Sequence, residues 1–254
     1  MKVFTKGSRR TGRRPRLRAP VIAIGASLAV AVPQPAMAAV PAPVAFPASA
    51  VNALPSARPV AVSPSTPLRP GSSGDSVRIL QRRLIEQGYW LGRVSGSYGL
   101  TTQQAVMAVQ KVVGLPRTGV LDARTWQKLQ AGARPRPRTK RAGRVIEISR
   151  SKQILMIVDS GRISTIVNTS TGRTPRATTP AGTWRFGRQI DRWHTAPLGR
   201  LYRPKFFFRG YAVHGSLSIP GYPASHGCAR VSVPAMDLLW SRSGIRRGDR
   251  VVIY

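Results

Sequence analysis

Apolar residues in the first half of the chain recur at the three- and four-residue spacing of amphipathic helices. Asp75 and Thr101 are the expected N-caps of the first two helices, and Gly114 is the expected end of the second. The pattern predicts a small three-helix bundle over residues 68–130. Its apolar positions are Val77, Leu80, Leu84 and Ile85, then Ala105, Val106, Val109 and Val113, and finally Trp126 and Leu129.

The pattern changes to that of β-strands after residue 143. Short runs of β-branched and aromatic residues alternate with turn signals such as Asp159-Ser160-Gly161. These features predict a mainly β, sandwich-like domain over residues 144–254, and the whole chain is expected to be an α+β multidomain protein. The expected strands include residues 145–148, 154–158, 163–167, 206–208 and 250–254, and a short helix is expected over 234–240.

Two proline-rich segments flank the predicted bundle. Residues 39–67 contain seven prolines among Ala, Val and Ser, and residues 131–143 alternate arginine with proline. Proline at this density disfavours helices and sheet interiors and favours an extended, solvated chain. Both segments are therefore predicted to be linkers, and the second is expected to be cationic and open to proteolysis.

Residues 1–38 have the layout of a secretory signal peptide. The first 18 residues carry eight Lys or Arg and no acid, residues 19–32 are apolar, and the segment ends in a small-x-small pattern at Ala36-Met37-Ala38. We expect cleavage after Ala38 and export to the cell wall or to the extracellular or periplasmic space. The apolar run is short for a membrane span, so membrane contact is expected only through this segment if it is retained.

The chain of 254 residues contains 41 Lys or Arg and 8 acidic residues, which gives a net charge of +33. Without the eight basic residues of the signal segment the charge would be about +25. Such a charge ordinarily suggests nucleic acid, but an exported protein meets wall carboxylates and anionic wall polymers instead. We therefore expect no nucleic-acid partner. The alternative is that the abundance of arginine merely reflects a high-GC genome.

The candidate chemistry is concentrated in residues 212–231. The only cysteine, Cys228, and two of the three histidines, His214 and His226, lie within fifteen residues of one another. An imidazole is the usual protein base for a thiol nucleophile, so this pair is suited to acyl transfer. Gly227 permits a sharp turn, from which the N–H groups of Gly227 and Cys228 could point at a developing oxyanion.

Two other interpretations of these residues stay open. A single cysteine is often a small buried apolar residue, and two histidines with one cysteine could bind zinc. We expect neither a metal nor another cofactor. A chelator should then leave activity unchanged, whereas a thiol-alkylating agent should abolish it. One cysteine also excludes any intramolecular disulfide.

Val-His-Gly at 213–215 and Ser-His-Gly-Cys-Ala-Arg-Val at 225–231 resemble the signature of the L,D-transpeptidase catalytic domain, whose members cross-link bacterial peptidoglycan. Ser170-Thr171-Gly172 and residues 179–184 match two further blocks of that family, and residues 187–205 fall where it has a flap. The resemblance implies that Cys228 is the nucleophile and His214 the base. It implies supporting or oxyanion roles for Ser225, His226, Gly215 and Gly227.

Arg230 stands where the family often has asparagine. An arginine here could bind a substrate carboxylate, and a structural salt bridge or a solvated position are the alternatives. No acidic residue stands at triad spacing, so we expect a backbone carbonyl to orient the imidazole of His214.

Residues 68–130 resemble the peptidoglycan-binding domain found beside many wall enzymes. The resemblance implies binding to peptidoglycan, although Tyr89, Trp90 and Trp126 taken singly are better explained as core residues. The matching residues include Gly74-Asp75-x-Val77-x-x-Leu80-Gln81, Gly88-Tyr89, Val109-Gln110, and Gly119-Val120-Leu121-Asp122 with Thr125-Trp126.

The two resemblances together predict an exported, cysteine-dependent L,D-transpeptidase acting on peptidoglycan stem peptides and glycan. Cys228 would attack the L-centre carbonyl of the third residue of a tetrapeptide stem and expel the terminal D-alanine. An amine from a second stem would then complete a cross-link. Water as the acceptor would give an L,D-carboxypeptidase, and loss of catalysis would leave a wall-binding protein.

Overall fold

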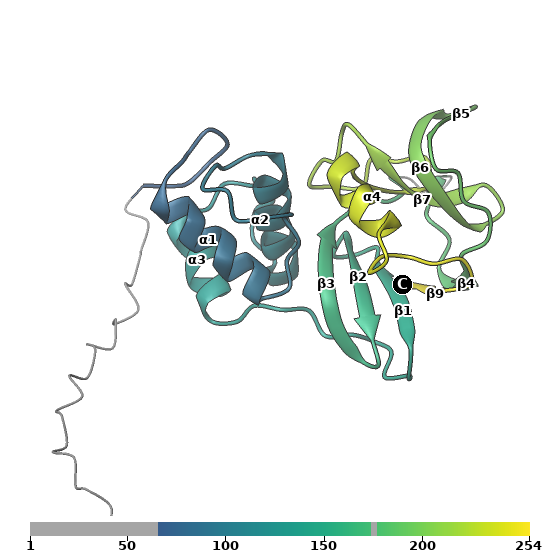
Figure 1. Cartoon of the computed structure of the whole chain (residues 1–254), viewed down its shortest axis with the longest axis horizontal. Coiled ribbons are helices and arrows are strands. Elements are labelled where there is room, and N and C mark those ends of the chain that lie inside the picture. The colour runs from purple at the N-terminus through teal and green to yellow at the C-terminus, as the bar shows by residue number, and fades with distance from the viewer. Residues whose placement is uncertain (1–65, 174–176) are drawn as a thin grey trace, which may run out of the picture. The chain divides into compact units, whose positions relative to one another are not determined.

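The computed structural model describes residues 66–173 and 177–254 (Figure 1). The predicted signal peptide, residues 1–38, lies outside the described residues, as does the predicted linker 39–67 except for its last two residues. Within the two described ranges, no helix combines the length and the apolar character needed to cross a bilayer.

The predicted helical bundle is present as α1 (Asp75–Glu86), α2 (Leu100–Val113) and α3 (Ala123–Gln130). Two buried glutamines of the predicted motif fix the turns between these helices. The amide of Gln81 bonds to backbone groups of residues 95–97, and that of Gln110 bonds to Gly119 N and Val120 O, each at 2.9 Å. These glutamines are therefore structural, because each satisfies turn groups that no helix or strand would pair.

The predicted helix caps are partly wrong. The N-caps of α1 and α2 are Gly74 and Gly99, without a side-chain hydrogen bond, so neither Asp75 nor Thr101 is a cap. Both predicted caps lie inside the first turn of their helices instead. Gly114 does end α2, in the left-handed conformation with φ of 73°, which glycine adopts at little cost.

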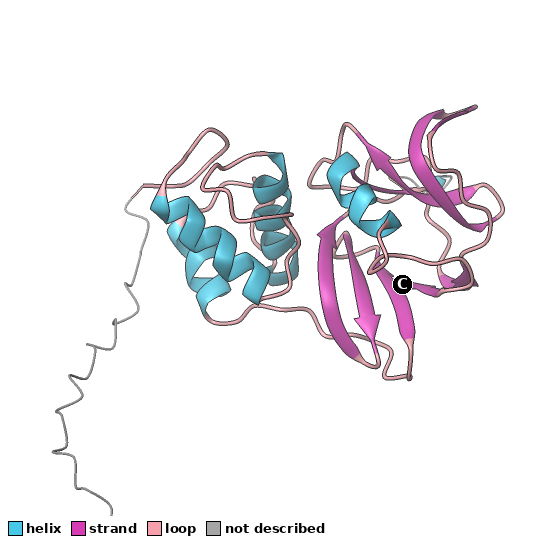
Figure 2. Cartoon of the chain, viewed as in Figure 1, coloured by secondary structure: helices cyan, strands magenta, loops and turns pink. Residues whose placement is uncertain are grey.

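The region after residue 143 forms two sheets (Figure 2). The five-stranded sheet has the order β3-β2-β1-β9-β4, and the four-stranded sheet has the order β5-β6-β7-β8. Pairing is antiparallel except between β1 and β9 and between β7 and β8. The elements are β1 (Arg144–Ser149), β2 (Ile154–Asp159), β3 (Arg162–Asn168), β4 (Gly182–Arg185), β5 (Trp193–Ala196), β6 (Gly199–Phe208), β7 (Tyr211–Ser216), β8 (Ala229–Ser232), α4 (Val233–Trp240) and β9 (Arg250–Ile253).

The predicted sandwich is confirmed by one apolar cluster shared between the two sheets. The first sheet contributes side chains such as Ile146 and Ile148, the second contributes Val213 and Val231, and α4 contributes Met236. Burial of apolar side chains from both sheets and a helix stabilises the arrangement, and α4 covers the end of the sheet that carries β7 and β8.

Strand β2 is buried on both faces. Leu155 and Ile157 belong to the sandwich core, whereas Ile154, Met156 and Val158 belong to a second cluster together with apolar residues of the three-helix bundle. This double burial explains why the sequence shows an uninterrupted apolar run here in place of the alternation of a half-exposed strand.

The chain between the helices also pairs with the edge of the five-stranded sheet. The N–H of Trp90 donates to Ile166 O at 3.0 Å, and the N–H of Ile166 donates to Gly88 O at 2.8 Å. Edge strand β3 is thus covered by a segment of the bundle, which removes an exposed row of backbone donors and acceptors. The helical domain and the sandwich therefore share a core and backbone hydrogen bonds.

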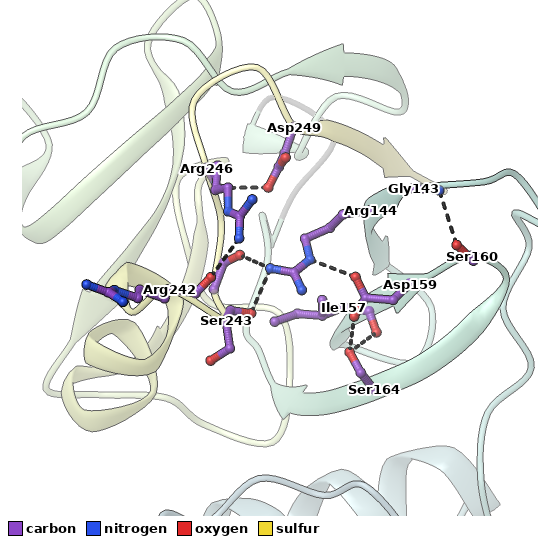
Figure 3. Close-up of polar contacts among 11 residues, drawn as sticks. Gly143, Arg144, Ile157, Asp159, Ser160, Ser164, Arg242, Ser243, Arg246 and Asp249 are labelled. Carbon is purple, nitrogen blue, oxygen red and sulfur yellow. Dashed lines mark hydrogen bonds and ion pairs between the residues drawn. The ribbon is translucent and has the colours of Figure 1, made fainter.

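Arg144, the first residue of β1, joins three segments of the β domain (Figure 3). Its Nε donates to Asp159 at 2.7 Å, and its Nη1 donates to the carbonyls of Ser243 and Gly244 at 3.0 and 2.8 Å. Partial burial raises the pKa of Asp159, but hydrogen bonds from Arg144 and Ser164 outweigh it, so the net pKa is below its ordinary value. The loop after α4 is thereby fixed to β1 and β2.

Residues 131–143 form no helix or strand, and they are not a free tether. The buried carboxylate of Glu147, on β1, accepts hydrogen bonds from the backbone N–H groups of Arg138 and Thr139 at 2.9 and 2.7 Å. It also accepts from the hydroxyls of Thr139 and Tyr254 at 2.7 and 3.1 Å. A carboxylate with four donors fixes the segment to the sheet, which argues against the proteolytic sensitivity expected from sequence.

Replacement of Glu147 by alanine should therefore loosen this segment. The change leaves two backbone donors without their buried acceptor, so we expect the free energy of unfolding to fall by about 3 kcal/mol. Urea denaturation measures the loss, and limited trypsin digestion should cut residues 134–141 faster. Glu86→Ala is the control, since its exposed pair with Arg83 contributes less than about 1 kcal/mol. Equal stability and equal cleavage of both variants would contradict the account.

Candidate active site

The sequence-predicted site residues meet at one pocket of about 470 Å³. His214, Ser225, His226, Cys228 and Arg230 all line it, and the predicted glycines 215 and 227 are chain neighbours of lining residues. The other lining residues come from the β5–β6 hairpin, from the residue before β7 and from both ends of β7. They are Ala196, Pro197, Leu198, Gly199, Arg200, Leu201, Gly210, Tyr211 and Ser216.

Parallel pairing of β7 with β8 brings the two chemical groups to the same place. His214 lies within β7 and is the register partner of Arg230 in β8, while Cys228 immediately precedes β8. The imidazole is 3% exposed and the thiol residue is half-buried. A ladder of backbone hydrogen bonds thus positions both groups, which gives tighter placement than two loops would.

The imidazole of His214 is oriented by a backbone carbonyl, as predicted. Its Nδ1 lies 2.9 Å from Gly215 O, which requires a proton on Nδ1 and leaves Nε2 as the acceptor in the neutral ring. Burial lowers the pKa of His214 because the charged ring would be poorly solvated, the hydrogen bond with Gly215 O partly opposes this, and the positive charge of Arg230 adds to the lowering, so that the net pKa is about 4. The ring is therefore neutral and able to accept a proton at neutral pH.

Burial also dominates at the thiol. It raises the pKa of Cys228 above its ordinary value, although a hydrogen bond with the backbone of Ala212 and the positive charge of Arg230 partly oppose the increase. With the imidazole pKa low and the thiol pKa high, the resting pair is a neutral thiol and a neutral ring. A nucleophilic thiol at this position would therefore lose its proton as it attacks, because these pKa shifts disfavour a preformed thiolate–imidazolium pair.

The turn before the thiol is built around Ser225. Its hydroxyl donates to Cys228 O at 2.5 Å and accepts from the N–H of Gly227 at 3.0 Å. Gly227 has φ of 120°, and a Cβ there would lie 2.5 Å from Cε1 of Tyr211. Glycine is therefore required, but its N–H is already paired, which differs from the expectation that it points at an oxyanion.

The backbone of Arg230 is paired, whereas its guanidinium has no ion-pair partner in the part of the chain that the structure describes. Its N–H and carbonyl bond to the carbonyl and N–H of Ser170 at 2.9 Å. Among the described residues, no carboxylate forms an ion pair with its guanidinium. The structure thus gives no support to a structural salt bridge within those ranges, and it leaves the guanidinium lining the pocket. His226, the supporting histidine of the prediction, is exposed at the same pocket.

The block at 170–172 holds the turn before Cys228 through hydrogen bonds. The hydroxyl of Ser170 donates to Tyr222 O at 2.8 Å and accepts from the N–H of Ala224 at 3.1 Å. The N–H of Ser225 donates to Thr171 O at 3.0 Å. These bonds give a physical reason for small hydroxyl residues here, which sequence reasoning had identified only by resemblance.

The predicted flap is an antiparallel hairpin of β5 and β6, with Ala196 paired to Gly199 across the turn. Its tip lines one side of the pocket, and Leu198 there is 69% exposed. Sequence patterning missed β5 and the first half of β6, where few side chains are buried and no alternation results, whereas the end of β6 contains the predicted strand 206–208. It also missed Arg200 and Tyr211 as lining residues, which carry no motif of their own.

His194, the remaining histidine, lies on β5 and contacts the ring of Phe206 edge to face, with centroids 6.3 Å apart. It does not line the pocket. Within residues 66–173 and 177–254, no three His, Cys, Asp or Glu side chains are grouped so that they could hold a metal ion, and this includes the candidate zinc ligands His214, His226 and Cys228.

Comparison with known proteins agrees with this architecture. A model of the peptidoglycan-binding domain matches residues 73–129, and a model of the L,D-transpeptidase catalytic domain matches residues 143–253. The crystal structure of an L,D-transpeptidase from Xylanimonas cellulosilytica is 48% identical, covers 74% of this chain and 97% of that chain, and superposes with a TM-score of 0.70. The chain belongs to the L,D-transpeptidase family. It combines a peptidoglycan-binding domain with a transpeptidase catalytic domain.

Curated relatives match only locally. The N-acetylmuramoyl-L-alanine amidase CwlL of Bacillus licheniformis is 41% identical over 71 residues, which are 27% of this chain and 20% of that protein. The amidase CwlM of Mycobacterium tuberculosis is 39% identical over 56 residues, which are 22% of this chain and 14% of that protein. The chain thus spans a fifth or less of the length of these two relatives, and their whole-protein activities do not transfer to it.

The neutral resting pair predicts how the thiol reacts with iodoacetamide. Because alkylation requires the thiolate and the pKa of Cys228 is raised, the rate should be low at pH 5–7 and should still increase above pH 9. The rate is measured by quenching the alkylation at a series of times and quantifying the modified protein by mass spectrometry. The urea-unfolded protein is the control, in which the midpoint should fall to the free value of about 8.5. Fast, pH-independent alkylation between pH 5 and 7 would show a preformed ion pair and contradict this assignment.

Proposed function

We propose that this protein is an exported peptidoglycan L,D-transpeptidase that forms a thioester through Cys228, with His214 as general base. The observation that carries the proposal is the sharing of one open pocket by the chain's only thiol and a buried neutral imidazole, whose Nε2 is the remaining acceptor. A chain of this family with that pair has the minimum groups for acyl transfer.

The first half-reaction would be acylation. Sγ of Cys228 attacks the carbonyl carbon at the L-centre of the third residue of a tetrapeptide stem, and the thiol proton passes to Nε2 of His214. Collapse of the tetrahedral intermediate breaks the amide bond, and the imidazolium returns the proton to the departing amine of D-alanine. The backbone N–H of Cys228 is the candidate oxyanion donor, since that of Gly227 is paired with Ser225. One such donor contributes on the order of 3 kcal/mol.

The second half-reaction would resolve the thioester. A side-chain amine of a neighbouring stem attacks the thioester carbonyl, His214 accepts the amine proton, and the thiol is released with the proton. The products are a cross-linked pair of stems and free enzyme. Water in place of the amine gives a carboxypeptidase, and the same residues serve both acceptors.

Arg230 would act on substrate and on the catalytic pair. Its guanidinium has no carboxylate partner among the described residues and lines the pocket, so a stem carboxylate is a suitable ligand. Its charge also keeps the imidazole neutral and favours the thiolate as attack proceeds. The exported, cationic chain would be concentrated at anionic wall polymers.

Acylation of the purified protein tests the proposal. With a tetrapeptide stem, intact-mass analysis should show one thioester adduct and release of one D-alanine, and a carbapenem should give one adduct, as the family resemblance implies. Cys228→Ala should form neither adduct. His214→Gln should acylate about 10²–10⁴-fold more slowly because it lacks the base.

His194→Gln is the matched control, because that histidine lies outside the pocket, and it should acylate at the wild-type rate. Addition of an amine acceptor separates the two outcomes of the thioester, since a dimeric stem product indicates transpeptidation and a shortened stem indicates hydrolysis. Wild-type acylation in Cys228→Ala would refute the assignment of the nucleophile.

A further inference from the structure

The helical domain contacts the loop that leads to the thiol. Arg117, in the turn after α2, donates from Nη1 to Gly221 O at 2.9 Å and from Nη2 to Ser151 O at 3.4 Å. A Cβ at Gly221 would lie 2.7 Å from Cβ of Arg117 and 2.9 Å from its carbonyl oxygen. The backbone segments around Arg117 and Gly221 therefore approach so closely that only glycine fits at position 221.

The loop continues from Gly221 to Cys228 through fixed backbone groups. Tyr222 O and the N–H of Ala224 both bond to the hydroxyl of Ser170, and the next residue is Ser225, whose hydroxyl bonds to Cys228 O. A displacement at Gly221 could thus be passed along this hydrogen-bonded segment to the thiol. Arg117 holds the start of the segment through its bond to Gly221 O.

A second contact of the helical domain, made by α2, supports the residues that hold the loop. The ammonium of Lys111, which is 2% exposed, donates to Gln153 O at 3.1 Å and to Thr169 O at 2.8 Å. The hydroxyl of Thr169 in turn donates to Arg230 O at 2.7 Å. Burial and, to a smaller extent, the charge of Arg117 lower the pKa of Lys111 to about 7. A buried amine with two carbonyl partners is consistent with a fixed interface.

We propose that Arg117 is a positioning residue of the active site, which acts through Gly221 to fix the loop 217–227 and so the place of Cys228. The inference rests on the proposed function of Cys228 as the nucleophile. In this arrangement the peptidoglycan-binding domain supplies part of the scaffold of the catalytic site, in addition to any contact that it makes with the wall. Removal of the guanidinium would release the loop without altering any group that touches substrate.

The test compares four variants of the full chain with wild type. R117M keeps the aliphatic stem of this half-exposed side chain and removes both hydrogen-bond donors. R117K restores one donor to Gly221 O. G221A forces the backbone at Gly221 away from that at Arg117. R93M is the control, because Arg93 is exposed in a turn of the same domain. Circular dichroism verifies the fold of each variant before kinetics and hydrogen exchange are measured.

We expect R117M and G221A to lower kcat for D-alanine release about 10-fold, with a change in KM of less than about 3-fold, because misplacement of the thiol slows attack and leaves the substrate contacts in place. Amide exchange in residues 217–227 should accelerate by a similar factor. R117K should recover most of both losses, and R93M should match wild type.

Wild-type kcat in both R117M and G221A would overturn the proposal. Faster exchange with unchanged kcat would do so as well, since it would show a purely structural contact. If wild-type protein released no D-alanine, the proposed function itself would fail. The rate of iodoacetamide alkylation of Cys228 would then serve in place of kcat, and an unchanged rate in both variants would overturn the positioning role.

Discussion

The parallel pairing of β7 with β8 is the constraint on which the site depends. The register of this pairing determines that His214 lies beside Arg230 and that the thiol of Cys228 lies directly before the neighbouring strand. The two strands are separated by twelve residues of loop, so the pairing alone would not fix that loop. Ser170 and Thr171 fix it from one side, and α4 packs against the strands that carry the chemical groups. The geometry therefore comes from backbone hydrogen bonds to a rigid sheet.

Burial sets the protonation states of the pair, and Arg230 adjusts them. Burial lowers the pKa of the imidazole and raises that of the thiol, whereas the guanidinium lowers both. The proposed export to an oxidising compartment is compatible with this arrangement, because a thiol that stays protonated is oxidised slowly. The nucleophile would be generated only when a substrate carbonyl is in place. A carbonyl partner for Nδ1 fits this scheme, since a carboxylate would favour the imidazolium.

The sequence was sufficient for features with local causes. Helical spacing predicted α1, α2 and α3, and the turn signal at Asp159-Ser160-Gly161 marks the end of β2 before β3. The two motif blocks contain five of the residues that line the pocket. Features that arise from tertiary packing were out of reach. The caps at Gly74 and Gly99 have no side chain to signal them, and the N–H of Gly227 is paired by a hydroxyl whose direction only the folded turn defines.

The same reason explains the larger differences. Composition made residues 131–143 look like a free tether, because nothing local shows that the buried Glu147 would bind their backbone. The apolar run of β2 was enough to predict a strand. It did not show that the helical domain packs against the face of β2 that points away from the sandwich core. Arg117 likewise carries no motif, and only its contact with Gly221 gives it a role.

The protonation state of His214 tests the central claim most directly. Nitrogen-15 chemical shifts of the labelled imidazole, assigned by comparison with His214→Gln, report both the tautomer and the pKa. The account predicts a neutral ring with its proton on Nδ1 at pH 7, which titrates near pH 4. An imidazolium at pH 7, whose signal changes in Cys228→Ala, would reveal a preformed ion pair with the thiolate and would contradict the account.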